Sequence, residues 1–521
     1  MPIRKRGKTE RFRRLMVGFI AFLLCTEFLA HSAQAQQASA TSASGLSAVA
    51  APNPGKADGA PKKQKVGPLE ISGSWRVRAE GWNWFEANAG DNDYAFAHSL
   101  LRLAIGQRTD RFEWLLEGAQ DSILALPSDA VVPPPQGQLG LGGTYFVANG
   151  NTRNNVNGFV KQAYIRIRRA GPFDVQIGRF EFLDGIEVLP KDQLLATIAQ
   201  ARVAQRLIGN FGWSAVGRSF DGARLTSDWG ANNLTFLAAR PTRGVYQVDG
   251  MGELDIDLFY GAYTRVVTAG DYSARVRAFG IGYLDYRESV LKTDNRPLPM
   301  RSVDNGGIQI GSYGAELLQV FDVRQGNKID IILWGVLQTG SWGMERHRAS
   351  AVMAEAGWQG TTAPLKPWLS VGYAYGSGDK NPNDGTHGTF FQILPTPRPY
   401  ARFPFWNMQN SGDFYGSAVL QPTAKLYLRS ELHTLRLANA SDLWYLGGGA
   451  FQPRTFGYTG RPSNGNRSLA NVWDASAEYQ LNKKFSIGVY YGRAWGKSVV
   501  ASIYPRNQDG QMAYLETNFK F

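Results

Sequence analysis

Residues 70–80 read EISGSWRVRAE, and this stretch decides the fold. Small or apolar residues (Ile71, Gly73, Trp75, Val77 and Ala79) alternate with polar ones along its whole length. Because successive side chains of a strand point to opposite faces, this period of two predicts a strand with one apolar and one polar face. The same alternation recurs at 162–168, 424–433 and 473–480, which predicts an all-β protein.

The N-terminus has the pattern of a secretory signal peptide, residues 1–35. A basic segment precedes the short apolar run 15–24, and Ala33-Gln34-Ala35 supplies the small residues of a cleavage site. Removal of this segment takes away Cys25 and lowers the formal net charge from +13 to +8. The mature chain, expected to begin at Gln36, therefore contains no cysteine and remains basic.

Two regions follow the signal. Residues 36–68 are rich in Ala, Ser, Pro, Gly and Lys and lack periodicity, which predicts a disordered periplasmic leader. Residues 69–521 carry the alternating strands, and 59 glycines and 12% aromatic residues across the chain agree with β structure.

The links between strands predict the topology. Eighteen strands can be placed, and we expect short and long links in strict alternation, the arrangement of an outer-membrane barrel with short periplasmic turns and long outer loops. The short links are 109–111, 170–172, 228–232, 268–271, 324–327, 421–423 and 482–484. The long links are 83–96, 121–157, 181–216, 288–304, 379–411, 438–470 and 496–509.

The C-terminal strand supports this fold class, a transmembrane antiparallel β-barrel. Leu515, Thr517, Phe519 and Phe521 share one face, and such an apolar final strand ending in Phe resembles the signal that the barrel-assembly machinery reads. We therefore expect the mature protein in the cell outer membrane, in contact with its lipid. Eighteen strands are in the size class that encloses an aqueous channel.

The polar strand faces must point inward, because a charged side chain in the middle of the bilayer costs about 2–4 kcal/mol. Arginines at i, i+2 spacing on several strands predict an electropositive lumen that attracts anionic solutes, while a plain alternative is that these charges pair and stiffen the wall. The predicted lumen-lining residues are Arg76, Arg78, Arg102, Arg166, Arg168, Arg275, Arg277, Lys425, Arg429 and Glu431.

Two long links contain candidate gate residues. Leu195, Ala199, Val203 and Leu207 recur every four residues, which predicts a short amphipathic helix within 191–207 that packs its loop in place. The second link contains Thr389-Phe390-Phe391 and several prolines, and long ordered loops often restrict a barrel mouth. The candidate gate residues are Arg179, Asp184, Arg202, Arg206, Asp379 and Asp384.

No motif predicts catalysis, a metal or a cofactor. Asp379, Asn381 and Asn383 have the first spacings of an EF-hand, but the turn position holds Asp384 and the twelfth position holds Phe390. This excludes the EF-hand and leaves open only a looser calcium site in the outer loops. The histidines of the mature chain (His98, His347, His387 and His433) do not have the spacing of metal ligands. The chain also lacks a Gly-x-Ser-x-Gly elbow and a His-Glu-x-x-His pair. An exported barrel with inward arginines does not fit a nucleic-acid partner.

Several segments resemble the alginate export family. They are 178–181 with Asp184-Gly185, the strand start 217–222, Gly378-Asp379 followed by Thr389-Phe390, and the block 426–437 with its alternating basic residues. The resemblance extends from about Ser72 to Phe521. It implies an eighteen-stranded outer-membrane barrel with an electropositive lumen, through which an anionic uronate polymer leaves the cell, and partners in a periplasm-spanning secretion complex.

These observations predict a passive outer-membrane channel for anionic polysaccharide or other acidic solutes. A general or small-solute porin is the alternative within the same class, and export and uptake are both compatible with the pattern. A barrel enzyme would need a nucleophile beside a base, and no such pair is recognisable. A surface adhesin would depend on loop 379–411 for binding and would keep its permeability without that loop.

Overall fold

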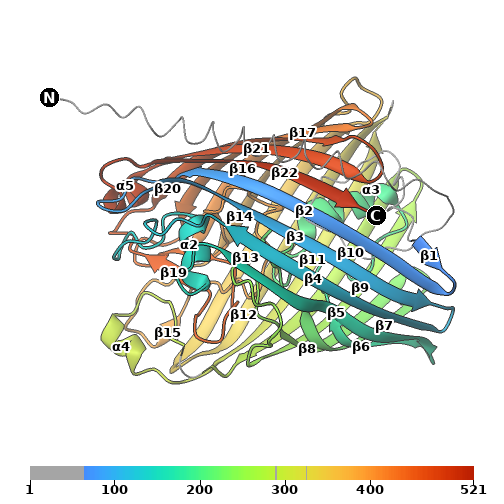
Figure 1. Cartoon of the computed structure of the whole chain (residues 1–521), viewed down its shortest axis with the longest axis horizontal. Helices are drawn as coiled ribbons and strands as arrows, with labels where there is room; N and C mark the ends of the chain where they lie inside the picture. Colours follow the sequence, from blue (N-terminus) through green and yellow to red (C-terminus); the bar gives the residue numbers. More distant parts are fainter. Residues whose placement is uncertain (1–63, 288–289, 324–325) are drawn as a thin grey trace.

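The computed structural model describes residues 64–287, 290–323 and 326–521, so the signal peptide and residues 36–63 of the leader lie outside the described residues. Eighteen long antiparallel strands pair with their neighbours in sequence, and the first of them pairs with the last to close a barrel (Figure 1). The eighteen-stranded antiparallel barrel predicted from the sequence is confirmed.

The barrel strands are mostly long enough to cross a bilayer. They are β2 (Leu69–Asn83), β3 (Asp93–Arg108), β4 (Phe112–Leu124), β5 (Asn155–Ala170), β6 (Phe173–Phe180), β7 (Phe220–Trp229), β8 (Asn232–Pro241), β9 (Ile256–Ala269), β10 (Tyr272–Asp285), β11 (Ile308–Val323), β12 (Asn327–Trp342), β13 (Glu345–Gly360), β14 (Trp368–Gly376), β16 (Ser411–Thr423), β17 (Leu426–Leu437), β20 (Ser468–Gln480), β21 (Phe485–Gly496) and β22 (Asp509–Lys520).

Shorter elements lie in the links. The helices are α2 (Leu141–Ala148), α3 (Gln193–Ile198), the π-helix η2 (Ala199–Val203), α4 (Leu298–Ser302) and α5 (Ser498–Ile503). The short strands are β1 (Gln64–Val66), β15 (Thr386–His387), β18 (Trp444–Gly447) and β19 (Tyr458–Arg461). None of the helices in the described part of the chain is both long and apolar enough to cross a membrane.

Alternation of side chains produces the two faces of the wall. On β2, Trp75 faces outward and is 36% exposed, whereas Arg76 and Arg78 face inward and are buried. The outward faces of the other strands carry large apolar side chains, as the bilayer requires. Examples are Leu103, Ile165, Ile177, Phe236, Phe259, Leu333, Val352, Val371, Phe414, Leu432 and Val489.

The first and last strands of the barrel meet at the closure between β2 and β22. Trp75 is the register partner of Phe519, and the backbone amide of Phe521 donates to the carbonyl of Gly73 at 3.0 Å. The apolar terminal strand therefore completes the wall that the first strand begins.

The links lie at two ends, with one departure from the expected alternation. Helices α2, α4 and α5 and strands β15 and β19 gather at one end of the barrel, and β1 lies at the other (Figure 1). Strict alternation is wrong at one place, because β12 and β13 are joined at the long-link end by Gly343 and Met344 alone. The φ of 61° at Gly343 suits such a tight turn.

The boundary of the leader also differs from the prediction. Strand β1 pairs with the first residues of β2, with Lys65 opposite Glu70, so the end of the region predicted as disordered up to residue 68 is an ordered hairpin. A further long link, 242–255, joins β8 to β9 and is absent from the predicted set.

Loop 181–219 folds into the barrel. It contains α3 and η2, so the helix predicted within 191–207 is present, although its second half is a π-helix. All four residues of the predicted apolar stripe, from Leu195 to Leu207, are buried. This loop contacts inward-facing side chains of β2, β10, β13 and β17, which lie on different sides of the wall. Only a position inside the lumen permits that.

Loop 377–410 packs against loop 181–219 in the same space. The amide of Leu394 donates to the carbonyl of Leu207 at 2.8 Å, and the amide of Gly209 donates to Leu394 at 2.9 Å. The tip of this loop is apolar and almost completely buried. Its buried apolar residues are Phe390, Phe391, Ile393, Leu394, Phe403, Phe405, Trp406 and Met408.

Candidate functional site in the barrel lumen

Arginines of the wall hold loop 181–219 through its backbone carbonyls. Arg76 on β2 donates to the carbonyl of Gly212 at 2.5 Å and also to Ser214. On the opposite part of the wall, Arg275 of β10 donates to the carbonyl of Gly185 at 2.7 Å. Guanidinium groups form strong hydrogen bonds with fixed geometry, so these contacts determine where the loop lies.

Other wall arginines are neutralised by carboxylates of the same loop. Arg277 lies 2.8 Å from Glu187, and Arg102 lies 3.0 Å from Glu181. Arg275 and Arg277 are 0% exposed. Both side chains point into the lumen, where the folded loop covers them and the loop and wall carboxylates neutralise them.

A buried charge network anchors the helical part of the loop. Arg202 of η2 forms ion pairs with Glu355 on β13 at 2.6 Å and with Glu431 on β17 at 3.2 Å. Arg429 pairs with the same Glu431 at 2.5 Å and donates to the carbonyl of Pro399 in loop 377–410 at 2.7 Å. The wall, the helix and the second loop thus share one network.

Arg206 extends this arrangement by stacking. Its guanidinium lies 3.9 Å from the ring centroid of Tyr400 and 5.3 Å from that of Trp334, and it donates to the carbonyl of Arg202. Both predicted gate residues of the helix, Arg202 and Arg206, are therefore buried structural contacts of the loop.

Three predicted positions do not belong to the lumen. Lys425 lies in the turn between β16 and β17, where it is exposed and its Nζ donates to the carbonyl of Leu481 in the next short link. Arg179 faces outward on β6, in a two-bonded ion pair with Asp221. Asp384 is exposed in the outer part of loop 377–410. Turn geometry and strand phase decided these positions, so these residues are not lumen-lining or gate residues.

The remaining predicted residues face the interior. Arg166 pairs with Asp174 at 3.0 Å, and Arg168 lies 3.7 Å from Glu113, both near the short-link end of the wall. Asp379 is buried in loop 377–410, where its amide donates to Asp442 at 2.9 Å.

Asp184 ties together the two ends of the helical segment. Its carboxylate accepts hydrogen bonds from the amides of Ile208 at 2.9 Å and Leu207 at 3.3 Å, and it lies 3.9 Å from Arg277. Burial raises the pKa of Asp184 to about 7, although Arg277 and the backbone amides oppose this shift. Asp442 in loop 438–467 behaves similarly, since burial raises its pKa to about 6.

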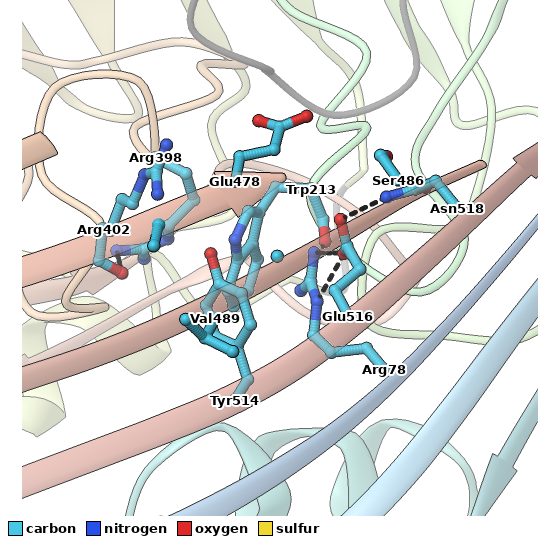
Figure 2. A pocket seen from close by; sticks show the side chains of 12 residues that line it. Arg78, Trp213, Arg398, Arg402, Glu478, Ser486, Val489, Tyr514, Glu516 and Asn518 are labelled. Atoms are coloured by element: carbon cyan, nitrogen blue, oxygen red, sulfur yellow. Dashed lines mark hydrogen bonds and ion pairs between the residues drawn. The ribbon is translucent and has the colours of Figure 1, made fainter. Parts of the chain in front are cut away.

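An inner pocket remains between the two loops and the wall on the short-link side (Figure 2). It has a volume of about 50 Å³. Arg78 enters it from β2, bonded to Glu516 at 2.8 Å, and its guanidinium lies 4.4 Å from the ring centroid of Trp213 and 4.7 Å from that of Tyr514. The pocket therefore presents one cation between two aromatic rings.

Two arginines of loop 377–410 complete the pocket, and the sequence analysis missed both. Arg398 lies 5.6 Å from the ring centroid of Trp213. Arg402 is half-buried, and its guanidinium has no hydrogen-bond or ion-pair partner among the described residues. Glu478 and Glu516 are the acidic residues among those that line the pocket (Figure 2). The sequence does contain a signal that could have indicated their burial. Both arginines lie in a segment rich in prolines and aromatic residues, a composition too apolar for a solvent-exposed loop.

The pKa values of these two arginines shift in opposite directions. Burial lowers the pKa of Arg398. Burial also disfavours the charged form of Arg402, but Tyr514 and the carboxylates of Asp474 and Glu431 outweigh it, so the net pKa lies above the ordinary value. Arg402 is thus a cation with free donors that faces the pocket.

A second, outer cavity of about 290 Å³ lies among the long links. Arg398 is the residue that lines both this cavity and the inner pocket. The outer cavity is lined mainly by residues of the long links, and the inner pocket by wall residues near the short links.

The described histidines come together only in part. Within the described ranges, no group of three or more His, Cys, Asp or Glu side chains could hold a metal ion. The fold does bring His347 of β13 and His387 of β15 together, with 2.9 Å between their Nδ1 atoms, a contact hidden by forty residues of separation.

The closed eighteen-stranded wall, the apolar outer face and the loops inside the lumen define an outer-membrane channel of the porin type. The model of the alginate export family matches residues 154–495, and the chain belongs to that family. The predicted resemblance and the outer-membrane location are confirmed. No curated protein sequence matches the chain significantly.

Solved structures share the fold at low identity. The crystal structure of Acinetobacter baumannii OccAB2 is 8% identical with a TM-score of 0.55, and covers 87% of this chain and 98% of its own. Pseudomonas aeruginosa OccK9 (OpdG) is 9% identical with a TM-score of 0.53, over 87% and 98% of the two chains. Pseudomonas aeruginosa OpdK, solved with vanillate, is 9% identical with a TM-score of 0.51 over the same shares. Family and fold are those of transport channels.

Proposed function

We propose that the barrel passes acidic solutes, including an alginate-like polyuronate, along a path that Arg398, Arg402 and Arg78 select by charge. The observation that carries this proposal is the position of Arg398 on both the outer cavity and the inner pocket. A solute moving between these spaces must pass a guanidinium group.

The chemistry suits repeated carboxylates. The guanidinium of Arg402 has unpaired donors, whereas that of Arg78 is already bonded to Glu516. A carboxylate should therefore bind Arg402 more tightly than Arg78 and can move from one to the other. Glu478 and Glu516 on the wall keep the arginines extended and limit how tightly an anion is held. Weak, repeated binding of this kind permits both entry and release.

A small-solute porin is the second candidate, and the filled lumen favours it. The two loops occupy the interior with buried apolar residues, so a polymer chain requires them to move, whereas a small acid needs only the spaces beside Arg398. We propose that loop movement separates the two transport modes.

Conductance in planar bilayers tests the proposed function. Under a salt gradient, the reversal potential should show anion preference, and oligouronate on one side should block the current in proportion to its concentration. The Arg402→Gln variant should weaken both effects. Arg346→Gln is the matched control, because Arg346 is exposed on the outward face of β13. Unselective pores that ignore oligouronate would overturn the proposal.

We further propose three kinds of partner for this channel. The C-terminal strand ending in Phe521 suits the barrel-assembly machinery, and the apolar outer face suits outer-membrane lipid. A periplasmic secretion complex would supply polymer to the short-link end. Arg76 and Arg429, which hold the loops in place, would then control how readily the path opens.

A further inference from the structure

The outer cavity combines aromatic walls with uncompensated positive charge. Trp84, Tyr246 and Phe451 contribute ring surfaces, and Arg398, Arg454 and Arg461 contribute guanidinium groups. The described residues that line it include neither Asp nor Glu. In this respect the outer cavity differs from the inner pocket, where Glu478 and Glu516 accompany the arginines.

The charges of this cavity are available to a ligand. Arg454 is exposed and has neither an ion pair nor a hydrogen bond among the described residues. Arg398 is 4% exposed, and its Nε has no hydrogen-bond partner in the described part of the chain. Arg461 is bonded to the carbonyls of Gln136 and Gln138 and to Tyr504, all of them neutral groups. A buried cation without an acidic partner favours binding of an anion.

Three of the uncharged polar side chains that line this cavity already form hydrogen bonds within the protein. Thr144 donates to the carbonyl of Gly140, Thr293 to that of Tyr458, and Gln452 to that of Ala148. A ligand with many hydroxyl groups would therefore leave some of them without partners, which costs about 1–3 kcal/mol for each buried group. A ligand with one anionic group and an apolar body avoids this cost.

We propose that the outer cavity binds one small carboxylate with an apolar ring, whose carboxylate pairs with the arginines and whose ring lies against the aromatic wall. Its volume of about 290 Å³ is sufficient, because a cavity of about 150 Å³ accommodates benzene. The inference rests on the proposed function, since Arg398 connects this cavity with the inner pocket. It makes aromatic acids a substrate class of the channel.

Calorimetric titration of the mature, detergent-solubilised barrel tests this. Benzoate is the probe, benzyl alcohol has the same ring without the charge, and glucuronate has the charge on a hydroxylated ring. Benzoate should bind at one site, at least about tenfold more tightly than either analogue. Arg454→Gln should weaken benzoate binding about tenfold. Arg346→Gln, on the outer face of β13, should not change it.

A variant that fills the outer cavity distinguishes binding inside it from general attraction of benzoate to a positively charged protein. Val147 lines the cavity on α2 and is 39% exposed, so Val147→Trp fills the space without disturbing a buried contact, and it should abolish benzoate binding. Absence of benzoate binding, equal binding of glucuronate, or unchanged affinity in Arg454→Gln would overturn the inference. Because titration needs no current, benzoate binding by a barrel without anion selectivity would support the cavity site and contradict the transport proposal.

Discussion

Arg202, on the helix inside the barrel, lies 2.6 Å from the carboxylate of Glu355 on the wall strand β13. Both side chains are almost completely buried. Removing one partner of a buried ion pair is costly, about 3–5 kcal/mol, because the other charge stays buried and uncompensated. This pair therefore connects the position of the helix with the state of the channel.

We expect Glu355→Gln to loosen loop 181–219 and raise single-channel conductance. The unfolding temperature of the barrel should fall as well, since Glu355 also accepts a hydrogen bond from Tyr415 at 2.7 Å. Glu253→Gln serves as control, because Glu253 is half exposed beside Arg240 and exposed pairs contribute about 0–1 kcal/mol. Unchanged conductance and unfolding temperature in Glu355→Gln would show that the pair does not hold the helix.

Gly376 at the end of β14 should be intolerant of a side chain. A Cβ atom there would lie 1.7 Å from the carbonyl oxygen of Met408, so the backbone of loop 377–410 fills that space. Gly376→Val should displace the loop and increase conductance while the barrel still folds. Gly416→Val is the control, since the nearest atom to its Cβ is 3.9 Å away. Equal conductance of both variants would contradict the prediction.

The contribution of Asp184 to the free energy of unfolding should fall as the pH rises from about 4 to about 7. Its pKa is about 7 in the folded protein, and an unfolded Asp has a pKa of about 3.9. In this window the folded state holds a proton that the unfolded state has lost, so rising pH favours unfolding until the folded carboxyl has also ionised.

Thermal unfolding of the wild type and of Asp184→Asn, measured side by side across pH 4–8, isolates this contribution. The difference between the two unfolding temperatures should change within the window and become constant above about pH 7. A difference that is constant from pH 4 upward would show that Asp184 is ionised throughout.

Cleavage after Ala35 is a prediction about a segment outside the described residues. The intact mass of the purified protein should correspond to a chain that begins at Gln36. Ala35→Asp should block processing, because the peptidase needs a small residue at this position, whereas Gln34→Ala should be processed normally. A mature mass that includes residues 1–35 would disprove the assignment.

Much of the barrel wall could be predicted because the direction of each side chain depends only on its position within its own strand. Trp75 and Arg76 are neighbours on one strand, so their side chains point to opposite faces. Because the bilayer tolerates only the apolar face, Trp75 faces the lipid and Arg76 faces the lumen. The rule fails where the chain leaves a strand. Lys425 keeps the alternation of its neighbours but lies in a turn, and Arg179 has the phase of the outer face, where Asp221 balances its charge.

The partners of the inward arginines could not be predicted. Arg277 of β10 meets Glu187, ninety residues earlier, only because loop 181–219 folds into the lumen. Arg398 and Arg402 became part of the site through the same long-range packing. Such contacts depend on how two apolar loops fit together, and periodicity contains no information about that fit.

The sequence by itself determined the barrel, its number of strands, its membrane-facing side and its inward arginines, because a bilayer imposes a period of two on each strand independently. Only the tertiary structure decided what those arginines do. Two loops fold inward: loop 181–219 covers Arg275 and Arg277, and loop 377–410 carries Arg398, which lines two cavities. The physical reason is that wall orientation is set by solvent, residue by residue, whereas the path is set by packing between segments far apart in the chain.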